Sequence, residues 1–184
     1  MDSSLFEPSL ETVKAILILD NNGDRIVSQY FNDPLHTSYK DQRTFEEKIF
    51  KKTKKSDSEI ILLDHMTVVY RSSIDLLFYV IGSVNENELM LMGLLNTLFE
   101  SLNLVLKRNL EKKAIVTSLN VVLMILDEIC NGGVILECDS NLVAQRVTVS
   151  RHEESTYKEI LSEQSIGSVL QTAKETLKRS ILSS

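Results

Sequence analysis

The sequence predicts an α+β fold in which helices pack on an antiparallel sheet, and three observations support this. Two strand-like runs, Met66–Arg71 and Leu76–Ile81, are rich in Val, Tyr, Phe and Ile and are separated by turn-forming residues, as in a hairpin. Leu76–Ile81 is apolar on both faces, which is typical of a central strand covered above and below. The segment after it predicts an apolar helix whose stripe extends past half of its circumference, so it should be buried on two sides.

Length and composition favour one globular domain in a reducing compartment. The chain has 184 residues, enough to bury a core without disulfides or metal ions. Its 26 acidic and 20 basic residues give a net charge of −6, which argues against a nucleic-acid partner. Cys130 and Cys138 fit no zinc spacing, and a disulfide between them is not expected. With no apolar run of membrane-spanning length and no signal peptide, the sequence predicts a soluble, cytoplasmic protein.

The first predicted elements form a hairpin. Val13–Leu19 is almost continuously apolar, so it should be another central strand. Asp20–Asp24 turns the chain through an Asn-Gly pair, whose residues tolerate positive φ. Arg25–Phe31 returns with a broken apolar pattern, as expected for an edge strand, and the Asp33-Pro34 pair ends it.

A helix and a short strand come next. Asp41–Phe50 predicts a helix with Phe45 and Ile49 on its inner side. Ile60–Leu63 predicts a short strand, and residues 64–65 turn into the hairpin described above. The order up to this point is therefore two strands, a helix, three strands and a helix.

The second half is mainly helical. Glu111–Cys130 predicts one further helix, which Asn131–Gly133 ends with glycines suited to a left-handed C-cap. Val134–Glu137 should be a short extended segment or turn, and Asp139 or Ser140 would then cap a short helix at 141–147. The apolar stripes of the two long helices are Leu91, Leu95, Leu98, Leu102 and Val105 in the first, and Ile115, Leu119, Val122, Leu126 and Ile129 in the second.

A change of composition at Ser150 divides the chain into a domain at 1–149 and a tail at 150–184. Arg151–Gln164 is polar and lacks periodic apolar residues, so it predicts a linker. Ser165–Ile181 is amphipathic and predicts a helix that could dock on its own domain, on a partner or on a membrane. Its apolar face has no Trp or Phe, which argues against the membrane.

The sequence predicts no catalytic, cofactor-binding or metal site, and therefore no enzyme. The Asp20–Asp24 turn resembles a calcium loop, but Arg25 stands where that loop needs glycine and Phe31 where it needs glutamate. His36, His65 and His152 are far apart in predicted turns or linker, so each should be a solvated loop residue.

Lys51, Lys52, Lys54 and Lys55 form the one basic run in the chain that suggests a contact. Lysines at the end of a helix complement its dipole and are usually solvated. They could also contact an anionic partner or phospholipid headgroups. Four lysines alone do not decide between these alternatives.

Four segments carry a resemblance to a known family. They are VKAILILDNNGDRIVSQYF (13–31), SDSEIILLDHMTVVYRSSIDLLFYVIG (56–82), NENELMLMGLLNTLFESL (85–102) and LDEICNGGVILECD (126–139). They resemble the small zeta subunits of coatomer, the COPI vesicle coat, and more distantly the sigma chains of clathrin adaptors. The resemblance implies a longin-like (SNARE-like) fold. That fold has a five-stranded antiparallel sheet with one helix on one face and two or more on the other, here followed by a C-terminal tail helix.

The resemblance also implies a non-catalytic structural role without a cofactor. Zeta-type chains pair permanently with the large gamma subunit in a heptameric coat. A small GTPase, whose contact with this chain would be indirect, recruits that coat to Golgi membranes. The coat buds vesicles for Golgi-to-ER retrograde and intra-Golgi transport. The alternative function is a free-standing longin-type regulatory domain that binds a small GTPase or a SNARE-type helix transiently.

The candidate partner interface is Ile60, Ile61 and Leu62. The strand that contains them is a candidate edge of the sheet and is apolar on both faces. An exposed apolar edge is an aggregation liability unless something covers it. A partner could cover these residues, or the helix at Asp41–Phe50 and the chain's own loops could do so.

Overall fold

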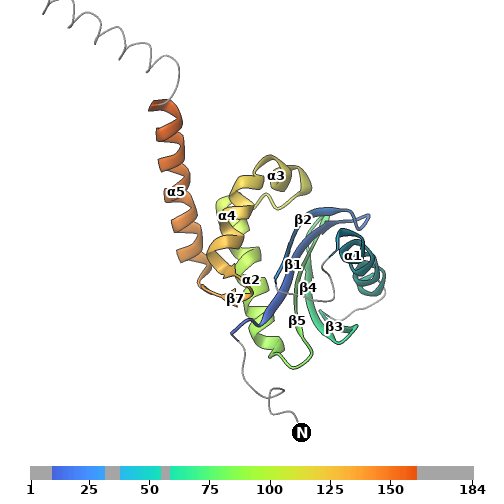
Figure 1. The fold of residues 1–184 in the computed structure, drawn as a ribbon. Helices are drawn as coiled ribbons and strands as arrows, with labels where there is room; N and C mark the ends of the chain where they lie inside the picture. Colours follow the sequence, from blue (N-terminus) through green and yellow to red (C-terminus); the bar gives the residue numbers. More distant parts are fainter. Residues whose placement is uncertain (1–9, 32–37, 55–58, 161–184) are drawn as a thin grey trace, which may run out of the picture. The chain divides into compact units, whose positions relative to one another are not determined.

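The computed structural model describes residues 10–31, 38–54 and 59–160, and for residues 152–160 it describes the backbone only. A five-stranded antiparallel sheet with the order β2-β1-β5-β4-β3 forms the centre of the fold (Figure 1). This order confirms the two predicted edge strands, at Arg25–Phe31 and Ile60–Leu63, and the predicted interior position of Leu76–Ile81. The strands are β1 (Val13–Asp20), β2 (Arg25–Tyr30), β3 (Ile60–Leu63), β4 (Met66–Ser72) and β5 (Leu76–Ser83).

Helices cover both faces of the sheet, as the α+β prediction required. Helix α1 (Tyr39–Thr53) lies on one face, and α2 (Glu88–Val105) and α4 (Leu119–Ile129) lie on the other (Figure 1). Under α1 the strands contribute Leu17, Val68 and Ile81 to a buried cluster, and α1 itself contributes Phe45 and Ile49. The predicted inner residues of α1 therefore do form its packing face.

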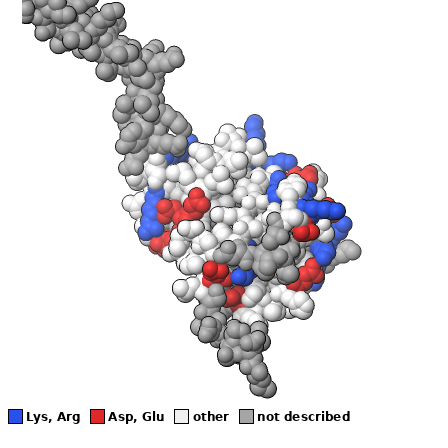
Figure 2. Space-filling view, viewed as in Figure 1, with Lys and Arg blue, Asp and Glu red and all other residues white. Residues whose placement is uncertain are grey.

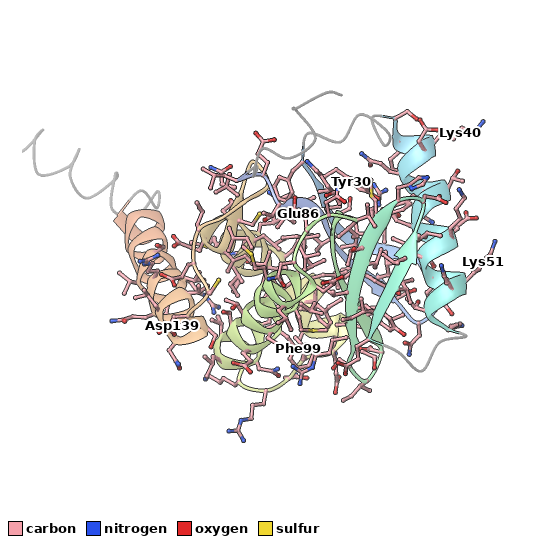
Figure 3. All side chains as sticks on the ribbon, turned by 90° about the horizontal axis from the view of Figure 1, so that it is seen from below. Tyr30, Lys40, Lys51, Glu86, Phe99 and Asp139 are labelled. Carbon is pink, nitrogen blue, oxygen red and sulfur yellow. The ribbon has the colours of Figure 1, made fainter. Side chains whose placement is uncertain are left out.

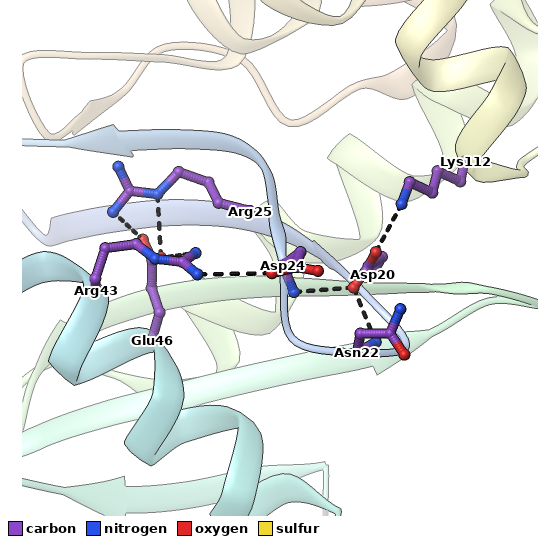
Figure 4. Close-up of polar contacts among 7 residues, drawn as sticks. All are labelled: Asp20, Asn22, Asp24, Arg25, Arg43, Glu46 and Lys112. Carbon is purple, nitrogen blue, oxygen red and sulfur yellow. Dashed lines mark hydrogen bonds and ion pairs between the residues drawn. The ribbon is translucent and has the colours of Figure 1, made fainter.

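A buried carboxylate fixes α1 to the hairpin β1–β2. Glu46 is fully buried, and its Oε2 accepts hydrogen bonds from Arg25 Nε at 3.0 Å and Arg43 Nη1 at 3.3 Å (Figure 4). Its Oε1 accepts one from the Tyr30 hydroxyl at 3.1 Å. The Arg25 guanidinium also lies 5.0 Å from the ring centroid of Tyr39. Because both Glu46 oxygens accept hydrogen bonds and two guanidinium groups balance its charge, the site tolerates a buried carboxylate.

The segment predicted as one helix over Glu111–Cys130 is two helices, so that prediction was wrong in detail. Helix α3 (Lys112–Thr117) ends at Ser118, whose φ and ψ are −113° and 35°, and α4 follows. The amides of Val121 and Val122 donate to the Ser118 carbonyl, at 2.9 and 3.2 Å. Thr and Ser are weak helix formers whose side chains compete for backbone hydrogen bonds, which suits a break at this position. As a result Leu119 is exposed, not part of the buried stripe.

A short hairpin follows α4. Its strands, of two residues each, are β6 (Cys130–Asn131) and β7 (Val134–Ile135). Its turn contains Gly132 at φ +58° and Gly133 at φ +85°, which confirms the predicted left-handed glycines. The Gly133 carbonyl accepts a hydrogen bond of 3.0 Å from the amide of Val13. The hairpin thus closes on the first residue of β1, although more than a hundred residues separate them in sequence.

Helix α5 extends beyond its predicted end. It runs over Ser140–Ile160, with Asp139 Oδ1 accepting from the amide of Asn141 at 2.9 Å. The linker predicted at Arg151–Gln164 is therefore helical as far as Ile160, because its Glu, Lys and Arg residues favour a helix without an apolar stripe. The predicted boundary at 149 falls inside α5, whereas packing divides the chain into units 1–145 and 146–184. The helix predicted at Ser165–Ile181 lies outside the described residues.

Candidate partner-binding surface

A lysine of α1 occupies part of the outward-facing backbone of the edge strand β3. Tyr70 of β4 donates its amide to the Glu59 carbonyl at 3.0 Å, and the strands pair Ile60 with Val69. Backbone groups alternate sides along a strand, so those of Ile60 and Leu62 point away from β4. The Lys52 ammonium of α1 donates a hydrogen bond to the outward carbonyl of Leu62. A lysine at an edge discourages pairing with another strand.

The three candidate interface residues point in different directions. Ile61 is 7% exposed and belongs to the buried cluster under α1. Ile60 is 38% exposed and Leu62 is 57% exposed. The helix that was the alternative cover therefore accounts for Ile61 alone. Ile60 and Leu62 remain the apolar surface of this edge.

The predicted basic run is partly engaged within the chain. Lys52 binds the Leu62 carbonyl, and the Lys54 ammonium lies 4.6 Å from the centroid of the Phe50 ring. Lys51 Nζ is 3.9 Å from a Glu47 carboxylate oxygen, and its side chain extends away from the sheet (Figure 3). Lys55 lies outside the described residues. Figure 2 shows basic side chains gathered on the side where Figure 1 places α1.

The turn that resembles a calcium loop is held by a lysine. Asp20 Oδ1 accepts from the amides of Asn22 and Asp24 at 2.8 and 2.9 Å, and Oδ2 accepts from Lys112 Nζ at 2.7 Å (Figure 4). Burial alone would raise the pKa of Asp20, but the hydrogen bonds from Lys112 and the two amides outweigh it and lower that pKa. Lys112 thus satisfies the carboxylate as an internal counter-ion.

The histidines and cysteines considered in the sequence do not form a metal site within the described residues. Within the described ranges, no cluster of three or more His, Cys, Asp and Glu side chains is arranged to hold a metal ion. His65 lies in the β3–β4 turn at φ +62°, and the side chains of His36 and His152 are not described. Cys130 and Cys138 are free thiols, and burial raises the pKa of Cys130 to about 11. In the same described ranges, no helix has the length and apolar character to cross a membrane.

A family model and a structural model, both of adaptor complexes, match this chain. The family described as clathrin adaptor complex small chain matches residues 12–154. The chain superposes with a TM-score of 0.62 and 17% identity on a chain of a homology model of the full-length AP-3 complex in a stretched open conformation, covering 80% of this chain and 98% of that one. That likeness shows the fold.

Curated relatives narrow the assignment. Coatomer subunit zeta-1 of Homo sapiens is 52% identical over 182 residues, 99% of each chain. Coatomer subunit zeta-2 of Arabidopsis thaliana is 39% identical over 178 residues, covering 95% of this chain and 97% of that one. Coatomer subunit zeta of Saccharomyces cerevisiae is 39% identical over 149 residues, or 76% and 79% of the two chains.

The fold and the match over residues 12–154 define a member of the clathrin adaptor complex small-chain family. Within that family the chain belongs with the coatomer zeta subunits, which are structural, non-catalytic components of the COPI vesicle coat. Its partners are therefore other chains of that coat. The predicted family and the predicted absence of enzymatic activity are both confirmed by this similarity.

Proposed function

We propose that this chain is the permanent small partner of the large gamma-type subunit in the COPI coat, and that it binds that subunit through the β3 edge. Similarity to coatomer zeta subunits over 99% of the chain is the observation that carries the proposal. The apolar side chains of Ile60 and Leu62, exposed on an edge strand, support it. Permanent interfaces are larger and more apolar than transient ones. A full-length match to coat subunits also favours this function over a free-standing longin-type regulator.

The proposed location follows from the proposed partner. Within the heptameric coat the chain would act at the cytosolic face of Golgi membranes and on COPI vesicles. It would serve Golgi-to-ER retrograde and intra-Golgi transport. A small GTPase would recruit the coat through other subunits, so that its contact with this chain is indirect.

The pairing is tested by co-expressing the chain with the trunk of a gamma-type large subunit and analysing both by size-exclusion chromatography at moderate salt. We expect a one-to-one complex, and lower solubility of the chain expressed alone because its apolar edge is then uncovered. A stable monomer that does not co-elute with the large subunit would contradict the proposal. In that case, capture by a GTP-bound small GTPase would test the regulatory alternative.

We also propose that Lys51 and Lys54, with Lys55, contact an anionic surface in the assembled coat. Lys52 would contribute less, since its ammonium already binds the Leu62 carbonyl. Each lysine near an anionic membrane contributes on the order of 1 kcal/mol. Reversing Lys51, Lys54 and Lys55 to Glu should therefore reduce recruitment of the coat to anionic liposomes about tenfold or more. Unchanged recruitment would show that the basic run is only a solvated helix end.

A further inference from the structure

We propose that an exposed apolar shelf between β3 and α2 receives an amphipathic helix of the large coat partner. The shelf consists of Ile60 and Leu62 from β3 and Leu89 and Met92 from α2. The inference rests on the proposed function, since it assigns the part of the surface and the kind of element that the partner would use. Leu89 and Met92 were not part of the predicted interface.

The strand register places Ile60 and Leu62 on the face of the sheet that α2 covers. Leu62 pairs with Thr67, and Thr67 pairs with Gly82. Directly paired residues of an antiparallel sheet point to the same face. A Cβ on Gly82 would lie 2.8 Å from a methyl group of Leu91, so this face is the one under the first turns of α2.

One side of α2 faces β4 and the neighbouring edge. Arg71 of β4 donates to Asn96 Oδ1 at 3.2 Å, and its guanidinium lies 3.9 Å from the Phe99 ring centroid (Figure 3 labels Phe99). Residues four and seven positions before Asn96 share its side of the helix, and these are Met92 and Leu89. Met92 is half-buried, whereas Leu89 is 78% exposed. The shelf therefore has apolar side chains on both of its borders.

The floor of the shelf is already covered. Thr67 and Val69 of β4 are fully buried between the two borders. A partner would therefore add contacts to the exposed side chains and would not need to fill a cavity. Apolar residues contributed by two elements that both neighbour β4 suit an amphipathic helix, whose anchors repeat every three to four residues.

An added strand fits this surface less well than a helix. Strand addition gains its affinity from main-chain hydrogen bonds along a free edge. β3 is only four residues long, and the Lys52 ammonium already binds the outward carbonyl of Leu62. A partner would therefore bind this edge mainly through side-chain contacts and not through main-chain hydrogen bonds.

Charge at the shelf indicates the chemistry of the partner helix. Glu88 is exposed in the first turn of α2, four positions before Met92 and on the same side of the helix. Within the described part of the chain no basic side chain forms an ion pair with Glu88. A partner helix with an apolar face and a Lys or Arg beside it would complement this border.

The main test replaces the two most exposed shelf residues in the full chain co-expressed with a tagged large subunit. Leu62→Asp and Leu89→Asp should each weaken the complex at least tenfold, because each places a charge in an apolar contact. Leu123→Asp on α4 is the matched control, since Leu123 is also about half exposed, at 47%, and lies outside the shelf. Its complex should form as well as that of the wild type. Equal binding by all three variants would overturn the shelf.

Two further variants test the helix and the charge. Lys52→Met frees the Leu62 carbonyl, so strand addition predicts stronger binding, whereas a docked helix predicts no change. Glu88→Lys should weaken binding several-fold and reduce its salt dependence. Asp127→Lys on α4 makes the same charge change outside the shelf and should have no such effect. Stronger binding by Lys52→Met would overturn the assignment of a helix.

A photo-crosslinking arm separates failure of the shelf from failure of the proposed partner. A benzophenone amino acid at position 89, or at 123 as control, is incorporated into the chain in assembled coat, and the crosslinked peptides are identified by mass spectrometry. Crosslinks from 89 to a gamma-chain helix support both proposals. Crosslinks from 89 to a helix of another coat chain keep the shelf and overturn the gamma pairing through it. Coat that assembles without crosslinks at 89 overturns the shelf.

Discussion

Replacing Glu46 by Ala is expected to lower the free energy of unfolding by about 3–5 kcal/mol, the cost of leaving a buried ion pair without one partner. Glu46 is fully buried and accepts hydrogen bonds from Arg25, Arg43 and the Tyr30 hydroxyl. Its loss leaves the largely buried Arg25 without a counter-charge and breaks the link between α1 and β2 (Figure 4). Pulse proteolysis in urea measures this change with little soluble protein.

Two comparisons make the Glu46 result specific. Glu47→Ala removes an exposed neighbour that lies 3.9 Å from Lys51 Nζ, so it should change stability by no more than about 0.5 kcal/mol. The double variant Arg25→Met, Glu46→Leu replaces the ion pair by apolar side chains and should recover much of the loss. A loss below about 1 kcal/mol for Glu46→Ala would show that the cluster is not a stabilising link.

Replacing Gly133 by Ala is expected to cost about 3 kcal/mol of folding free energy. Gly133 has φ +85°, a conformation that costs a residue with a side chain about 1–2 kcal/mol. A Cβ at this position would also lie 2.6 Å from the Val13 carbonyl oxygen. The turn of the β6–β7 hairpin would have to move away from β1, breaking the hydrogen bond from Val13 to Gly133.

The adjacent glycine supplies the control. Gly132 has φ +58°, but a Cβ there would meet no atom within 4 Å. Gly132→Ala should therefore cost only the backbone term, about 1 kcal/mol. The difference between the two variants, again measured by pulse proteolysis, isolates the close approach to β1. Equal losses of folding free energy would mean that close packing of the hairpin turn against β1 does not contribute to the effect of Gly133→Ala.

The sheet was largely predictable from local sequence. A strand buried on both faces has few polar residues, which identified Val13–Leu19 and Leu76–Ile81 as interior strands. Residues that break this pattern identified Arg25–Phe31 as an edge. Turn and cap residues act through their own backbone conformation. The Asn-Gly turn and the Gly132-Gly133 turn could therefore also be predicted from the sequence. The resemblance of four segments then supplied the family.

Other local features were predicted less well. An apolar stripe continues through Ser118 in sequence, and only the backbone shows that the helix breaks there and exposes Leu119. Polar composition at Arg151–Gln164 suggested a linker, but the chain is helical as far as Ile160 because helix propensity does not require an apolar stripe. Both errors come from reading periodicity as the only signal of a helix.

The candidate surface was decided by tertiary structure. Sequence marked Ile60, Ile61 and Leu62 as one apolar set, but alternation along β3 turns Ile61 into the core and leaves the other two exposed. The contact of Lys52 with Leu62 joins two separately predicted features, and Asp20 meets Lys112 from 92 residues away. Local pattern determines which residues prefer a strand, a turn or burial, because those preferences depend on neighbours in the chain. Which exposed side chains share a surface depends on strand register and helix placement, which only the packed fold sets.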